Sequence, residues 1–264
     1  LRWRPNGGYD YFEPRMAGRY FTKPDNWAVI YFLSTDYRKP LALDLDFNYD
    51  YSPQWDRDHF TLNLEPRIRL GDHFFMIPQV TWDYFYRDYG FAGFPTETTS
   101  GSNGELITRT LRDRAVFGER NVFNLTALID ARYAFNPLSS LGIRLRQFWS
   151  RVNYLNYFDL EMDGGLMAFN APDAANYNAN IDPVDFNLFF NTLNLDLRYS
   201  WWFAPASEMV ILYRVALSNA GKEIEDRYLQ NIDQALGAPI QNNISIRISY
   251  FLDYHQTKSR YLKR

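Results

Sequence analysis

The stretch "LALDLDFNYDY", Leu41 to Tyr51, constrains the fold more than any other part of the chain. Leucine, phenylalanine or tyrosine occupies every second position, and alanine, aspartate or asparagine occupies the positions between. Side chains of a strand point alternately to opposite faces of a sheet, so this stretch predicts a strand with one apolar face and one acidic face. Such a strand fits a soluble sandwich, which buries the apolar face against a second sheet, and also a membrane barrel, which turns that face to lipid.

The same alternation recurs along the chain in segments longer than the ~5–6 residues of an average globular strand. A strand that crosses an outer membrane needs ~9–11 residues, so the length of the segments favours the barrel. We predict nine spanning strands: Trp27–Tyr37, Leu41–Tyr51, Phe60–Leu70, Phe74–Tyr86, Val122–Phe135, Leu141–Tyr154, Leu188–Phe203, Glu208–Asn219 and Asn243–Tyr254.

The connections between these segments alternate in length. The short ones are Arg38–Pro40, Gly71–His73, Asn136–Ser140 and Ala204–Glu208. The long ones are Ser52–Asp58, Asp88–Arg120, Asn156–Asn187 and Ala220–Asn242. Short periplasmic turns and long extracellular loops characterise outer-membrane barrels, and aromatic residues at the strand ends match their interfacial girdles. Within the long loops, two further hairpins are expected at Thr108–Phe117 and Phe158–Met167.

The number of strands bears on domain organisation. Single-chain bacterial barrels have an even number of strands with both termini inside, whereas these nine begin outside and end inside. We therefore expect Leu1–Arg4 to be the tail of an earlier strand, with about 9–10 spanning strands in this chain. The predicted fold is an all-β, antiparallel transmembrane β-barrel, of which residues 1–254 form the C-terminal portion. Residues 255–264 form a basic periplasmic tail.

Composition and motifs exclude several classes of function. The net charge of −3 gives no reason to expect a nucleic-acid partner. The longest uncharged apolar run, around Trp27–Leu33, is far shorter than the ~20 residues of a membrane-spanning helix. The three histidines lie at or beyond strand ends, and no hydrolase, metalloprotease or phosphate-binding motif is present. We predict that the chain is not an enzyme and holds no metal and no cofactor.

A calcium loop is the one metal site that the opening stretch suggests. Asp44–Asp50 spaces its Asp and Asn residues as the first ligands of an EF-hand do. Tyr49 and Trp55, however, stand where that loop needs glycine and glutamate. These residues are instead interpreted as the polar face of one strand.

The polar faces of the predicted strands carry charges that would project into the barrel lumen. Opposite charges on neighbouring strands pair across a sheet, so they either fill and rigidify the lumen or line a permeation path. The set is Asp44, Asp46, Asp50, Glu65, Arg67, Arg69, Asp83, Arg132, Arg144, Arg146, Asp196, Arg198, Arg214 and Arg247.

Two loop segments carry polar side chains. "NAPDAANYNANIDPVDFN" (Asn170 to Asn187) suits hydrogen bonding and stacking on a sugar, or a calcium ion, although a loop rich in turns has the same composition. Its candidate ligand residues are Asp173, Asn176, Tyr177, Asn178, Asp182 and Asp185. "TLRDRAVFGERN" (Thr110 to Asn121) mixes arginines with acids and is interpreted as a self-paired hairpin rather than a phosphate site.

Five stretches together, and in this order, resemble a known family: "YDYFEPRMAGRYF", "STDYRK", "LRQFWSRVNY", "NTLNLDLRYSWWFAPASEMVILYR" and "ISIRISYFLDY". They are similar to a C-terminal outer-membrane β-barrel domain of unknown function in Gram-negative envelope proteins. In that family the barrel commonly follows an N-terminal β-sandwich similar to carbohydrate-binding modules. The resemblance implies a location in the outer membrane and an association with carbohydrate, and it brings no catalytic residues.

These observations lead to two hypotheses. In the first, the chain belongs to a porin-like outer-membrane barrel that binds or passes glycan-type material at the cell surface, with the lipid bilayer as its surroundings. In the second, a plugged barrel serves as an anchor or as a subunit of a larger envelope complex with protein partners. Both require a continuous exposed apolar band, whereas a sandwich would cover it with a second sheet. The residues expected in this band are Leu43, Leu45, Leu62, Leu64, Leu195, Leu197, Ile246 and Ile248.

Overall fold

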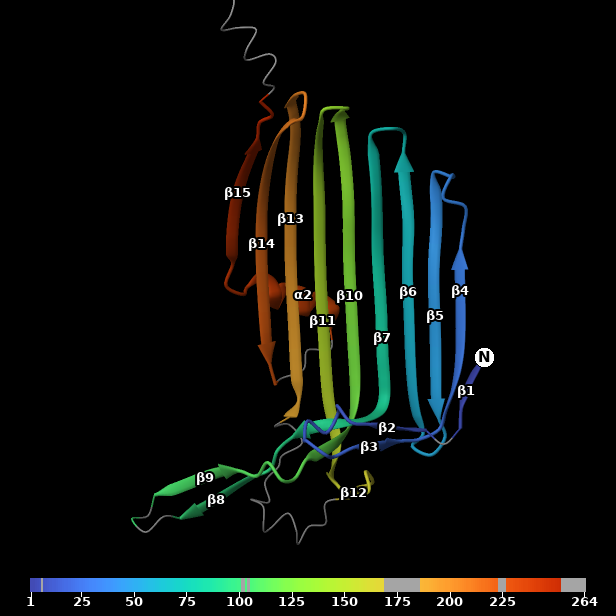
Figure 1. Cartoon of the computed structure of the whole chain (residues 1–264), viewed down its shortest axis with the longest axis vertical. Coiled ribbons are helices and arrows are strands. Elements are labelled where there is room, and N and C mark those ends of the chain that lie inside the picture. Colours follow the sequence, from blue (N-terminus) through green and yellow to red (C-terminus); the bar gives the residue numbers. More distant parts are fainter. Residues whose placement is uncertain (6, 101–102, 104, 169–185, 223–226, 253–264) are drawn as a thin grey trace, which may run out of the picture.

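One large antiparallel sheet dominates the computed structural model, which describes residues 1–5, 7–100, 103, 105–168, 186–222 and 227–252 (Figure 1). The order of strands across it is β1-β4-β5-β6-β7-β10-β11-β13-β14-β15, and β12 pairs with β11 outside this path. The strands are β1 (Arg2–Arg4), β4 (Asn26–Ser34), β5 (Leu41–Ser52), β6 (Arg57–Leu70), β7 (Phe74–Gly93), β10 (Val116–Asn136), β11 (Ser139–Leu160), β12 (Leu166–Ala168), β13 (Leu188–Ala204), β14 (Ser207–Gly221) and β15 (Gln241–Ser249).

Three smaller elements stand apart from this path. β2 (Gly8–Asp10) pairs with β3 (Phe21–Lys23), and β8 (Thr96–Ser100) pairs with β9 (Leu106–Thr110). Helix α2 (Tyr228–Leu236) lies between β14 and β15 in the chain. Within the described residues, no helix combines the length and apolar character needed to cross a membrane.

All nine predicted long strands are present, as β4, β5, β6, β7, β10, β11, β13, β14 and β15. Tight turns join β4 to β5, β6 to β7, β10 to β11 and β13 to β14 along one end of the sheet (Figure 1). β7, β10 and β11 contain 20, 21 and 22 residues and extend further from the turns than predicted. The predicted loop Asp88–Arg120 is therefore wrong at both ends, because its first residues continue β7 and its last ones begin β10.

The predictions for the additional hairpins have different outcomes. The hairpin at Thr108–Phe117 is wrong, because Thr108 pairs with Thr98 and Phe117 belongs to β10. Threonine is enriched in strands, which suits the pairing of the threonine-rich β8 with β9. The hairpin at Phe158–Met167 is confirmed, since Asp159 pairs with Met167.

The sheet is open within the part of the chain that the structure describes. β1 pairs antiparallel with only the first residues of β4, Asn26 to Ala28, so the rest of that edge is free. β15 forms the other edge and ends at Ser249, earlier than the predicted Tyr254. The described part of the chain therefore has an all-β, antiparallel fold, and its strands do not close into a barrel.

The apolar face is not covered by a second sheet in the described residues. Ile246 and Ile248 on β15 are exposed, at 62% and 65%. The other members of the band that was expected to be exposed are half-buried, namely Leu43, Leu45, Leu62, Leu64, Leu195 and Leu197. Side chains directly opposite on neighbouring strands lie ~4.5–5.5 Å apart at Cβ and cover each other's flanks, whereas an edge strand has a neighbour on one side only.

Helix α2 covers part of this apolar face. Asn231 of the helix is fully buried, and its side-chain oxygen accepts a hydrogen bond from Asn191 Nδ2 at 2.7 Å. Tyr228 donates a hydrogen bond from its hydroxyl to Gln147 Oε1, also at 2.7 Å. Asn191 and Gln147 are polar residues at apolar-face positions of β13 and β11, and the helix supplies hydrogen-bond partners for Asn191 Nδ2 and Gln147 Oε1.

These contacts predict that Asn231→Ala loosens the helix. The substitution leaves Asn191 buried without the side-chain acceptor, which costs roughly 1–3 kcal/mol. Hydrogen–deuterium exchange should accelerate in residues 228–236 and in the adjoining part of β13. The exposed Gln234→Ala in the same helix is the matched control, and equal exchange in the two variants would contradict the role given to Asn231.

Candidate functional site

The charged residues of β5 and β6 that were predicted to line the lumen lie on one face of the sheet. They pair with neighbouring side chains of that same face. The carboxylate of Asp44 accepts hydrogen bonds from Ser34 and from Tyr37, each at 2.6 Å, and lies 3.4 Å from Arg67 Nε. Arg67 also pairs with Glu65 at 2.9 Å. These contacts join neighbouring positions of the sheet surface.

Pairing between neighbouring side chains of the polar face continues across the other strands of the sheet. Asp196 lies 2.7 Å from Arg214, and Asp130 accepts a hydrogen bond from Arg144 Nε at 2.9 Å. The remaining contacts are Arg247 with Glu208 at 3.3 Å, Arg198 with Ser200 at 3.3 Å, Asp46 with Asn63 at 3.4 Å, and Arg69 over the Phe75 ring at 6.0 Å. Arg132 and Arg146 have no hydrogen bond or ion pair among the residues that the structure describes. The polar face is thus largely self-paired.

His59 connects this polar face to the loop end of the sheet. His59 Nε2 lies 2.8 Å from Asp83, and His59 Nδ1 lies 3.7 Å from Asp50. Asp50 also accepts hydrogen bonds from Arg2 at 3.1 Å and Asn26 at 2.9 Å. Asp50 therefore joins β5 to β1 and to the first residue of β4.

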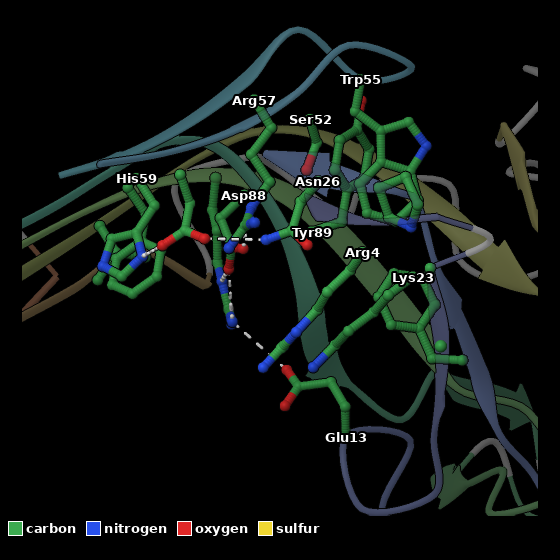
Figure 2. A pocket seen from close by; sticks show the side chains of 18 of the residues that line it. Arg4, Glu13, Lys23, Asn26, Ser52, Trp55, Arg57, His59, Asp88 and Tyr89 are labelled. Atoms are coloured by element: carbon green, nitrogen blue, oxygen red, sulfur yellow. Dashed lines mark hydrogen bonds and ion pairs between the residues drawn. The ribbon is translucent and has the colours of Figure 1, made fainter. Parts of the chain in front are cut away.

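A pocket of about 480 Å³ opens beside Asp50, between the N-terminal segment and the loop ends of β5, β6, β7 and β10 (Figure 2). We name it the loop-end pocket. Its charged lining residues come from both sides: Arg2, Arg4, Glu13, Lys23, Asp50, Arg57, Asp88 and Arg120. Its aromatic lining residues are Phe21, Trp55, His59, Phe85 and Tyr89.

A β-bulge places Asp88 in this pocket. Arg87 has a positive φ of 53°, and the pairing of β7 with β10 shifts so that Phe85 faces Val122 whereas Asp88 faces Arg120. Strict alternation along β7 would put Phe85 and Asp88 on opposite faces, and the extra residue puts both on the polar face.

Asp88 then pairs with two arginines. Its carboxylate lies 2.9 Å from Arg57 Nε and 3.1 Å from Arg120 Nη2. Burial alone would lower the pKa of the Arg120 guanidinium, but Asp88, Tyr154 and Glu13 outweigh this effect, so the pKa is raised. Arg120 is therefore a fixed positive charge in the pocket.

Glu13 links the N-terminal segment to this cluster. Its Oε1 lies 3.4 Å from Arg120 Nη2 and accepts a hydrogen bond from the backbone N–H of Phe91 at 2.8 Å. Phe21, which is 1% exposed, anchors the same segment against Trp55 and Phe117, with ring centroids 5.5 and 4.7 Å apart. The segment therefore forms one wall of the pocket through both ionic and apolar contacts.

The sequence-based predictions match this site only in part. Asp50 was expected on the polar face and lies in the pocket, whereas Glu13, Arg57 and Asp88 were not predicted as site residues. The interpretation of Arg120 as part of a self-paired hairpin is wrong, since its partners lie on β7 and in the N-terminal segment. The candidate loop ligands Asp173, Asn176, Tyr177, Asn178, Asp182 and Asp185, and the tail 255–264, lie outside the described residues. No cluster of three or more metal-ligating residues occurs in the described ranges.

An open antiparallel sheet with one apolar face, one self-paired polar face and a charged pocket at its loop end defines an all-β protein in its described part. The chain belongs to the family described as "Domain of unknown function (DUF5916)", which matches residues 1–261. No curated protein and no solved structure shows significant similarity to it.

The β2–β3 hairpin beside the pocket contains a carboxylate, Asp10, whose titration tests its contact with the lining residue Lys23. Partial burial alone would raise the pKa of Asp10, but hydrogen bonds from Lys23 and from the backbone N–H groups of Glu13 and Phe12 outweigh this effect, so the pKa is lowered from its usual value. A lowered folded-state pKa means that Asp10 stabilises the β2–β3 hairpin above about pH 4. That contribution is lost as the pH falls through the folded-state pKa.

We predict that Lys23→Met moves the pKa of Asp10 back upward in an NMR titration of the carboxyl carbons. Asp36 is the internal control, because its pKa is lowered by Arg38 in the β4–β5 turn and not by Lys23. An unchanged Asp10 titration in Lys23→Met would show that the 2.5 Å contact between these two residues does not persist in solution.

Proposed function

We propose that the chain forms part of the wall of an outer-membrane β-barrel that binds glycan-type material at the cell surface. The apolar face, outside the part that helix α2 covers, would contact lipid, and the polar face would line the interior. The observation that carries this proposal is the apolar face itself, which extends over nine long strands without a covering sheet in the described residues. In water such a face would be an aggregation liability.

The distribution of aromatic side chains supports the membrane part of the proposal. Phe135, Trp201 and Tyr250 are exposed, at 51%, 42% and 64%, and lie near the tight turns. Exposed aromatic residues at strand ends are typical of the interfacial girdles of outer-membrane barrels. On this proposal the tight turns lie on the periplasmic side and the loop-end pocket on the extracellular side.

Barrel closure is a requirement of the proposal. In hydrocarbon every backbone N–H and C=O needs a partner, so the free edges of β4 and β15 must be paired in the complete protein. The central strands also contain more residues than a bilayer crossing, so the sheet would project beyond the membrane on the loop side.

The loop-end pocket supports the binding part of the proposal. Arginine guanidinium groups, carboxylates and aromatic rings converge there, which provides donors, acceptors and apolar surface for a hydroxyl-rich ring. Its location at the loop end would make it accessible from outside the cell. The association with glycans in particular derives from the resemblance described above.

A second candidate function is a structural anchor or a subunit of an envelope complex, with a closed lumen. The observation that favours it is the pairing of charged side chains with one another on the polar face, for example Asp196 with Arg214. Purified protein in planar bilayers discriminates between the candidates: ion conductance supports passage of solutes, whereas no conductance together with no binding on a glycan panel supports the anchor.

The membrane location is tested by fractionation together with a pair of adjacent substitutions. The complete protein is expected in the detergent-extracted outer membrane, and recovery in the soluble fraction would refute the barrel. Leu45→Arg should lower the membrane-assembled fraction, because a cation on the lipid face costs ~2–4 kcal/mol at the bilayer midplane. Asp46→Arg, at the next position but on the opposite face, should assemble like the wild type.

A further inference from the structure

The charges of the loop-end pocket do not balance among its described lining residues. Five of these residues are cationic, namely Arg2, Arg4, Lys23, Arg57 and Arg120, and three are anionic, namely Glu13, Asp50 and Asp88. The three acids are all engaged by arginines of the lining. Lys23 pairs with Asp10, which lies outside the lining.

Arg4 is the cationic lining residue without an acidic partner among the described residues. It has no hydrogen bond or ion pair to any residue that the structure describes, and its residue is exposed. In Figure 2 the side chains of Arg4 and Lys23 both extend into the cavity in the direction of Glu13. An arginine presents a planar fork of donors that fits a carboxylate or a phosphate in a bidentate manner.

The other lining residues of the pocket indicate which chemical groups a ligand carries besides an anionic group. Glu13, Asp50 and Asp88 are acceptors that would repel a small free anion but would accept hydrogen bonds from hydroxyl groups. Trp55 and Tyr89, with ring centroids 4.6 Å apart, provide an apolar wall. The volume of about 480 Å³ lies in the range of small-molecule sites, ~300–1,000 Å³.

We infer that the loop-end pocket binds an acidic saccharide, a sugar that carries a carboxylate or a phosphate group. Arg4 binds the anionic group, with Lys23 beside it, and the acids of the pocket accept hydrogen bonds from sugar hydroxyl groups. Trp55 and Tyr89 pack against the apolar side of the ring. This inference rests on the proposed glycan-binding function and specifies the chemical class of the ligand.

Calorimetry on the purified complete protein in detergent tests the inference with four probes: trigalacturonate, glucose 6-phosphate, maltotriose and inorganic phosphate. One or both acidic sugars should bind, more weakly at high salt, because Coulomb attraction is screened. Arg4→Gln should weaken this binding about tenfold, which corresponds to ~1.4 kcal/mol. Arg38→Gln, in the exposed β4–β5 turn at the other end of the sheet, is the matched control and should bind like the wild type.

Three results would overturn the inference. Maltotriose binding as tightly as trigalacturonate would show that no anionic group is recognised. Inorganic phosphate binding as tightly as glucose 6-phosphate would show a simple anion site. Equal affinity in Arg4→Gln and wild type would exclude Arg4 as the anion receptor. Fractionation separates this test from the barrel proposal: a protein of the outer membrane that binds neither acidic sugar refutes the inference alone.

Discussion

The register between neighbouring strands is the constraint on which the rest of the structure depends. A shift of one residue would move every side chain of a strand to the opposite face. Leu45 lies opposite Leu33 on one side and Leu64 on the other, and Asp44 lies opposite Ser34 and Glu65. Because such pairings repeat across the sheet, one face is apolar and the other collects nearly all the charges of the long strands.

The parts of the fold that follow from local alternation were predictable from the sequence. The segment Leu41–Tyr51 alternates apolar and polar residues at every position, which predicts a strand with two unlike faces. β5 matches the predicted bounds of this strand to within one residue. The hairpin predicted at Thr108–Phe117 was wrong because Thr108 pairs with β8, whereas Phe117 pairs with β7 as part of β10. Threonine favours strands in either arrangement, so propensity alone does not choose the partner strand.

The loop-end pocket was not predictable in the same way. Glu13 and Arg120 are far apart in the sequence, and their contact requires the N-terminal segment to fold back over the sheet. Asp88 lies on the polar face only because of the bulge at Arg87. Arg87 has a positive φ, a conformation that the sequence would have indicated if a glycine stood there. Alternation alone assigns Asp88 to the apolar face, where an unpaired carboxylate would be costly. That conflict is the one signal in the sequence that could have revealed the bulge.

The double contact of Glu13, to the Arg120 side chain and to the backbone N–H of Phe91, has a thermodynamic consequence for the N-terminal segment. Glu13 and Lys23 of this segment also line the pocket, so occupancy of the pocket and the docking of residues 7–23 are linked equilibria. A ligand that contacts these two residues binds the docked segment and therefore stabilises the docking. By the same linkage, a change that weakens the docking lowers the affinity for the ligand.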